Sequence, residues 1–182
     1  NDLYGTTEVK IGDTIIDFKA PYKRISMYDA IKEHTGIDIS SMNEEELRGV
    51  CRQLGIHVDN SMGKGKLIDE IFGGKCEGHY VQPTFIIDYP VEMSPLTKKH
   101  RRVEGLVERF ELMVNGKEIA NAYSELNDPI DQRERFEDQL RLQERGDDEA
   151  MFIDHDFLRA LEYGMPPTSG IGIGIDRLTM LL

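Results

Sequence analysis

An Asn-Gly dipeptide between two strand-like segments constrains this chain more than any other feature. Asn115-Gly116 is typical of a two-residue hairpin turn, because both positions of that turn need a positive φ. The flanking segments, 110–114 and 117–123, are rich in aromatic and aliphatic residues, which favour strands. The sequence therefore predicts two antiparallel strands joined by this turn.

Two carboxylates lie on the predicted hairpin. With this turn, Met113 faces Glu118, and Glu111 faces Ala120. Side chains alternate between the two faces of a strand, so Glu111 and Glu118 emerge on one face as diagonal neighbours. Such carboxylates repel each other unless a cation lies between them, and Mg²⁺ prefers oxygen ligands of this kind, completed by substrate phosphates. The alternative is a pair of glutamates on a solvated face.

Three further polar residues follow on the second strand: Asn121, Tyr123 and Glu125. Strict alternation places them on the face opposite Glu118. If all five residues serve one pocket, an irregularity near Ala120-Asn121 must turn the chain over. We predict a β-bulge there, since bulges are common beside active sites.

Residues 168–182 read TSGIGIGIDRLTMLL and predict a strand followed by a helix. Gly170, Gly172 and Gly174 alternate with isoleucine, so one face of the strand carries no side chains and admits a flat ligand or another backbone. The helix begins near Gly174–Asp176, and Arg177 in its first turn could stack on a base or contact a phosphate. Neither the Rossmann nor the Walker motif fits this spacing. The alternative is a tightly packed strand with a surface arginine.

The rest of the chain predicts an α+β fold. A strand pair is expected around Gly12-Asp13, and strand 81–89 precedes the central hairpin. Residues 27–80 read as a helical insertion packed on the sheet, with helices at 27–34, 44–54 and 66–72. Ser41 and Glu44 form a possible capping box, and Gly73-Gly74 should end the third helix. Helices are also expected at 130–145, lying on the surface, and at 157–163.

Composition narrows the classes of function. The net charge of −12 argues against a basic domain that grips nucleic acid, although a catalytic domain can take that affinity from another module. No apolar run is long enough for a transmembrane helix, and no secretory leader is visible. Cys51 and Cys76 read as reduced thiols, so we expect a cytoplasmic protein without a membrane.

Two segments carry a resemblance to a known family. RFELMVNGKEIANAYSELNDP, followed by GMPPTSGIGIGIDRLTMLL, resembles the lysyl-tRNA synthetases, a family of class II aminoacyl-tRNA synthetases. The resemblance extends through QPTFIIDYPVEMSPLTKKH and covers nearly the whole chain. The last segment looks like the third signature motif of the class, and ANAYSELNDP looks specific to the lysine branch.

The resemblance implies an antiparallel sheet of the class II synthetase type, flanked by helices, and a set of site residues. Glu111 and Glu118 would hold the Mg²⁺ that bridges ATP phosphates. Gly174, Asp176 and Arg177 would also contact ATP, with Arg177 as the catalytic residue. The lysine pocket would comprise Asn121, Tyr123, Glu125 and Gly174. The implied reaction joins lysine to ATP as lysyl-adenylate and then transfers lysine to tRNA(Lys).

Other parts of the family pattern have no counterpart in the sequence. The anticodon-binding domain and the first two class signatures are absent, so we expect residues 1–182 to be a partial catalytic domain that is inactive alone. The resemblance implies a homodimeric parent enzyme. Two alternatives stay open: a synthetase-like paralogue that lysylates a protein, and a non-catalytic domain that binds lysine or a nucleotide.

Overall fold

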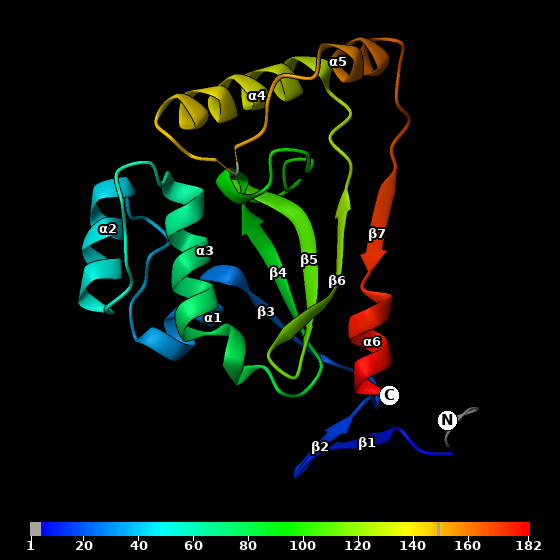
Figure 1. The fold of residues 1–182 in the computed structure, drawn as a ribbon. Helices are drawn as coiled ribbons and strands as arrows, with labels where there is room; N and C mark the ends of the chain where they lie inside the picture. The colour runs from blue at the N-terminus through cyan, green and yellow to red at the C-terminus, as the bar shows by residue number, and fades with distance from the viewer. Residues whose placement is uncertain (1–4, 149) are drawn as a thin grey trace.

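A five-stranded sheet forms the centre of the computed structural model, which describes residues 5–148 and 150–182 (Figure 1). Its strands are β3 (Lys23–Ser26), β4 (Thr84–Pro90), β5 (Leu106–Val114), β6 (Lys117–Ser124) and β7 (Ser169–Ile173), and they lie side by side in that order. Only the β3–β4 pair is parallel; the other neighbours are antiparallel. The predicted α+β class with a mainly antiparallel sheet is confirmed.

Helices connect the two parallel strands. Between β3 and β4 the chain forms α1 (Met27–Thr35), α2 (Glu44–Gln53), α3 (Lys64–Lys75) and the short 3₁₀ helix η1 (Glu77–His79). Parallel neighbours need such a crossover, because a tight turn cannot join them. The helices bury a shared core against the sheet, in which Ile86 of β4 and Met113 of β5 meet Met27 and Phe72. The reading of 27–80 as an insertion stays a prediction.

Two predicted helix boundaries in this region are wrong. Asn43, not Ser41, is the N-cap of α2, and it exchanges hydrogen bonds with Glu46 in a capping box. Helix α3 continues through Gly73 and Gly74 to Lys75. A helical glycine costs only about 1 kcal/mol, and the buried residues around the pair, such as Phe72 and Cys76, supply packing that outweighs it.

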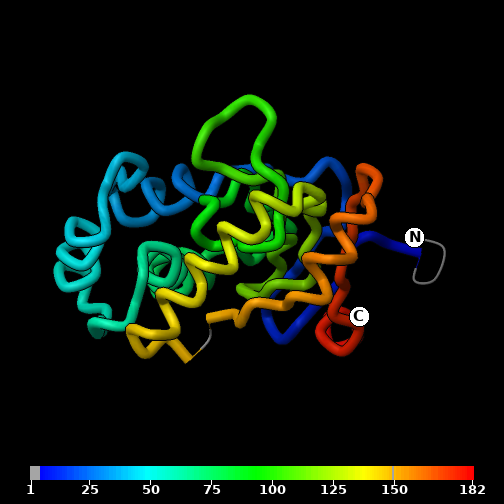
Figure 2. Tube along the Cα trace, turned by 90° about the horizontal axis from the view of Figure 1, so that it is seen from above, coloured from blue at the N-terminus to red at the C-terminus, as the bar shows by residue number. Residues whose placement is uncertain are grey.

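Two helices cross one end of the sheet, α4 (Pro129–Glu144) and α5 (His155–Glu162). Asp128 and Asp154 cap them. The expected surface position of α4 is only half right, because Arg135 is buried and donates to the backbone oxygens of Ser94 and Thr97. Seen from above, the loop between β4 and β5, residues 91–105, projects beyond the sheet and α4 (Figure 2); it begins with the short helix η2 (Val91–Met93).

A second, smaller core lies at the other end of the sheet. The predicted N-terminal hairpin, β1 (Glu8–Ile11) with β2 (Thr14–Asp17), contributes Ile16, and α6 (Ile175–Leu181) contributes Leu181. Both pack against Val114 and Ile119 of the central hairpin. Within the described residues, no helix is both long and apolar enough to cross a membrane.

Candidate functional site

The central hairpin has the predicted turn and a bulge. Asn115 and Gly116 both have positive φ, at 53° and 66°, and Met113 lies opposite Glu118 as expected. The register then shifts, because Leu112 pairs with Ala120 and leaves Ile119 as the extra residue of β6. The predicted β-bulge is therefore confirmed, one residue earlier than Ala120-Asn121.

The bulge changes which residues share a face. Glu111 lies opposite Asn121, not opposite Ala120 as strict alternation predicted. Residues directly opposite in an antiparallel pair point to the same side. Glu111, Glu118 and Asn121 therefore share one face of the sheet, and Tyr123 joins them two residues further along β6.

Gly170 and Gly172 of β7, which we call the glycine strip, belong to this same face. Gly172 pairs with Asn121, and Gly170 pairs with Tyr123. The alternating isoleucines, Ile171 and Ile173, point to the opposite face. We call the surface formed by Glu111, Glu118, Asn121, Tyr123, Glu125, Gly170 and Gly172 the site face.

Glu125 lies directly after β6 and closes one end of the site face. A Cβ atom added to Gly170 would come within 3.0 Å of its Oε1, so the carboxylate lies over the bare strand. Tyr123 stands between Glu125 and Asn121 along β6. Burial, together with the charge of Glu125, raises the pKa of the Tyr123 hydroxyl, which therefore stays protonated and able to donate.

Glu111 lies at the edge of the site face that adjoins the crossover helices. Arg109 Nη2 donates to its Oε1 at 2.5 Å, and only 13% of the Glu111 side chain is exposed. Burial raises the pKa of Glu111, and the charge of Glu118 adds to this, whereas Arg109 opposes it. The carboxylate is thus held by one cation and is poorly solvated.

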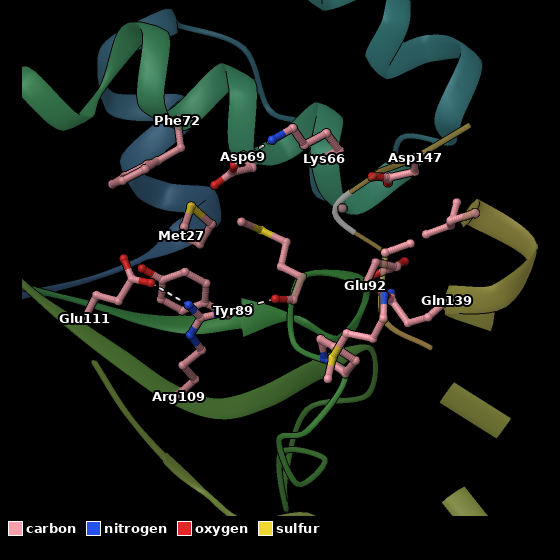
Figure 3. Close-up of a pocket in the computed structure, with 16 residues that line it drawn as sticks. Met27, Lys66, Asp69, Phe72, Tyr89, Glu92, Arg109, Glu111, Gln139 and Asp147 are labelled. Atoms are coloured by element: carbon pink, nitrogen blue, oxygen red, sulfur yellow. Dashed lines mark hydrogen bonds and ion pairs between the residues drawn. The ribbon is translucent and has the colours of Figure 1, made fainter. Parts of the chain in front are cut away.

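A cavity of about 350 Å³ begins at this pair and runs beneath the helices (Figure 3). Glu111, Arg109 and Tyr89 form its sheet side, and Met27 and Phe72 approach from the helices. The cavity lies beside the site face, not over the glycine strip.

Arg109 and Tyr89 are site residues that the sequence reasoning missed. Arg109 precedes Glu111 by two positions on the same strand, so period-two alternation was a usable signal. Tyr89 had no such signal. It reaches this side because the register of β4 shifts between Ile87 and Tyr89, where Asp88 has a φ of 57°.

The third-motif residues lie at the other end of the site face. Gly174 is the N-cap of α6, and its N–H donates to the Ile119 oxygen at 2.9 Å. Arg177 Nη1 donates to the Glu118 backbone oxygen at 2.6 Å, so the arginine is held against the main chain of β6 at Glu118. Asp176 lies exposed in the first turn of α6.

Arg177 also lines a surface hollow of about 470 Å³. Its other lining residues are Gly73, Glu77, Gly78, Gly116 and Lys117. The hollow is thus lined by two cations, three glycines and one carboxylate, and it includes the residue that precedes Glu118 on β6.

The donor set at the site face fits Mg²⁺ only together with a ligand. Among the described residues no group of three or more His, Cys, Asp or Glu side chains could hold a metal by itself. Mg²⁺, however, is commonly bound through one or two carboxylates plus substrate phosphates. Glu111 and Glu118 offer that number of carboxylates.

Comparison with known proteins supplies the family. The family described as tRNA synthetases class II (D, K and N) matches residues 3–182. The chain is 74% identical over 181 residues to a lysine–tRNA ligase of Porphyromonas gingivalis and 70% identical over 181 residues to that of Azobacteroides pseudotrichonymphae. A lysine–tRNA ligase of Christiangramia forsetii is 70% identical over 178 residues.

These alignments cover 98–100% of this chain but 31–36% of each relative. The chain therefore spans about a third of the length of the curated relatives that it matches. Because the family match covers nearly every residue, the chain belongs to the class II tRNA synthetases of the D, K and N group.

Proposed function

We propose that the full-length protein containing this chain activates lysine with ATP and Mg²⁺ and transfers it to tRNA. The observation that carries the proposal is the shared site face. The bulge at Ile119 brings Asn121 to the same side as Glu111 and Glu118, and the strand pairing adds the bare strip of β7. Without the bulge, the predicted lysine and metal residues would lie on opposite sides of the sheet.

Lysine is proposed to lie along β6, over the glycines. Its side-chain ammonium pairs with Glu125, whose carboxylate stands over Gly170. Tyr123 lines the aliphatic stem. The α-carboxylate then points toward Asn121, four residues or about 13 Å along the strand at about 3.3 Å per residue. The Glu125 carboxylate at this end of the pocket favours the lysine side chain over acidic or amide side chains, because those would need a hydrogen-bond donor at the same position.

ATP is proposed to occupy the Glu118 end of the site face. Glu111 and Glu118 would hold Mg²⁺, which neutralises phosphate charge when bound. Arg177 adjoins Glu118, where its guanidinium can bind phosphate oxygens or stack on the base. Gly174 leaves room for the close approach of the nucleotide, and Asp176 follows it at the start of α6.

The chemistry needs positioning more than a covalent nucleophile. A lysine carboxylate oxygen forms a bond to the α-phosphorus, the bond to the bridging oxygen breaks, and pyrophosphate leaves with that electron pair. A tRNA hydroxyl then attacks the carbonyl carbon and releases AMP. Residues that align the carboxylate and stabilise the developing charge are sufficient for such a transfer.

Transfer to tRNA is favoured over the two alternatives by the relatives. Proteins that are 70–74% identical to this chain carry the name lysine–tRNA ligase. A paralogue that lysylates a protein would form the adenylate but would not charge tRNA. A regulatory domain would bind lysine without exchanging pyrophosphate. The homodimer implied by the resemblance and the cytoplasmic location expected from the two thiols stay predictions.

Lysine-dependent ATP–pyrophosphate exchange by the full-length protein tests the proposal. Glu125→Gln should lower kcat/KM for lysine by roughly 30-fold or more, because it leaves the substrate ammonium without its partner. Glu108→Gln is the matched control, since Glu108 lies on the opposite face of β5 and pairs with Arg101. Exchange that is independent of lysine, or unchanged in Glu125→Gln, would refute the proposal. The 182-residue chain alone should show no exchange.

A further inference from the structure

We propose that Arg109 is a positioning residue of the site face, which holds the Asn121 amide so that an N–H of Nδ2, and not the amide oxygen, is offered to the ligand. This inference rests on the proposed function and names the substrate group that Asn121 receives: the α-carboxylate of lysine. Arg109 itself would act through Asn121.

Arg109 is held from several sides. Its Nη1 donates to the Met93 oxygen at 3.0 Å and to Ser94 Oγ at 2.9 Å. Its guanidinium carbon lies 4.4 Å from the centre of the Tyr89 ring. The side chain is 16% exposed. A planar cation fixed in this way has little freedom to move when a ligand arrives.

The remaining donors of Arg109 are aimed at the site face. Nε donates to Asn121 Oδ1 at 3.2 Å, and Nη2 donates to Glu111 Oε1 at 2.5 Å. Asn121 Nδ2 in turn lies 3.5 Å from the same Glu111 oxygen. One arginine therefore connects two residues of the site face that come from neighbouring strands.

The chemistry of the three groups determines the orientation of the amide. A guanidinium only donates and a carboxylate only accepts, whereas an amide has one side of each kind. Oδ1 must therefore face Arg109 and Nδ2 must face Glu111. The second N–H of Nδ2 is left for a ligand that brings an acceptor. The site face thus has two ends of opposite character: Glu125 receives a cation, and Asn121 receives an anion.

The ratio of two dissociation constants tests this inference in the full-length protein. Calorimetry would measure binding of L-lysine and of L-lysinamide, which keeps both amino groups but lacks the carboxylate. In the unaltered protein lysine should bind more tightly than lysinamide. In Arg109→Met this preference should shrink about tenfold, because the guanidinium no longer holds the amide oxygen away from the ligand and only the 3.5 Å contact to Glu111 still orients the amide. Arg109→Lys should not restore it, because one ammonium lacks the fork that holds both Glu111 and Asn121.

Arg135→Met is the matched control. Arg135 is another buried arginine, and it anchors the same loop through the oxygens of Ser94 and Thr97, but it lies on α4. If Arg109 acted only by fixing this loop, both variants would lose the preference equally. That result, or an unchanged preference in Arg109→Met, would overturn the inference.

A second variant keeps the inference testable if Arg109→Met does not fold. Asn121→Asp leaves Arg109 in place and replaces the N–H donors by an oxygen, so lysine should lose at least about tenfold in affinity while lysinamide loses less. An equal loss for both ligands would contradict the assigned orientation. If the unaltered protein binds no lysine, the proposed function fails first.

Discussion

One face of the central sheet is divided into a covered half and an open half. Under α1 and α3, the side chains of β4 and β5 are closed off from solvent: Ile86 is 0% exposed and Met113 is 1% exposed. Across β6 and β7, the same face carries polar residues and glycines. The difference shows how the fold makes room for a ligand. The crossover helices cover the apolar part of the face as far as Glu111 on β5. Beyond Glu111, the polar residues of β6 and the glycines of β7 lie uncovered.

The sharpest contrast between the halves is expected in stability. Ile86→Ala should lower the free energy of unfolding by about 2–5 kcal/mol, because it opens a cavity beneath the crossover helices. Ile171 lies on the opposite face of β7 and is 60% exposed. Ile171→Ala should therefore change the free energy of unfolding by less than about 0.5 kcal/mol. Urea unfolding measures both values. Equal losses would mean that β7 is as tightly packed as β4.

A change in the open half should affect binding while sparing stability. A Cβ at position 172 would lie 3.9 Å from the nearest atom, the Asn121 oxygen, so Gly172→Ala should fold normally. Its methyl group would occupy ligand space at a cost of about 1–3 kcal/mol in binding lysine, or roughly 5- to 150-fold in affinity.

Gly49→Ala is the control for this change. Gly49 lies in α2 and also has open space at its Cβ, so alanine there should stabilise the helix slightly and leave lysine affinity unchanged. Calorimetry and thermal unfolding of both variants measure the contrast. A Gly172→Ala protein with full affinity would show that no ligand lies on the strip.

The smallest effect is expected in the pH dependence of stability. Burial raises the pKa of Glu111, so its contribution to stability is complete below its ordinary pKa of about 4.5 and is lost as the pH rises through the raised value. Glu108 behaves oppositely. Arg101 lowers its pKa to about 2, so its contribution is present above about 4.5 and is lost as the pH falls toward 2.

Urea unfolding between pH 2 and pH 7 separates the two residues. Glu111→Gln should remove a decline in stability above pH 4.5, and Glu108→Gln should weaken the decline on acidification. The same direction of change in both variants would contradict the assignment of Glu111 to a poorly solvated border position.

The sequence predicted the structure correctly where residues close together in the chain decide it. Asn115-Gly116 predicted the turn, the alternating glycines predicted β7, and the conflict between Glu118 and Asn121 predicted the bulge. The sequence was less informative where tertiary packing decides. Gly73-Gly74 looked like a helix end but lies within α3. The network around Arg109 depends on a register shift in β4 and on how the loop before β5 folds back onto the sheet, which no local pattern records.

The most direct test of the account is where a metal-bound nucleotide and lysine lie on the sheet. A crystal structure of the full-length protein with lysine, a non-hydrolysable ATP analogue and Mn²⁺ would locate the metal by its anomalous scattering. The account predicts a peak beside Glu111 and Glu118, with lysine over Gly170 and Gly172 and its ammonium at Glu125. A peak away from both carboxylates, or lysine on the side of Ile171, would contradict it.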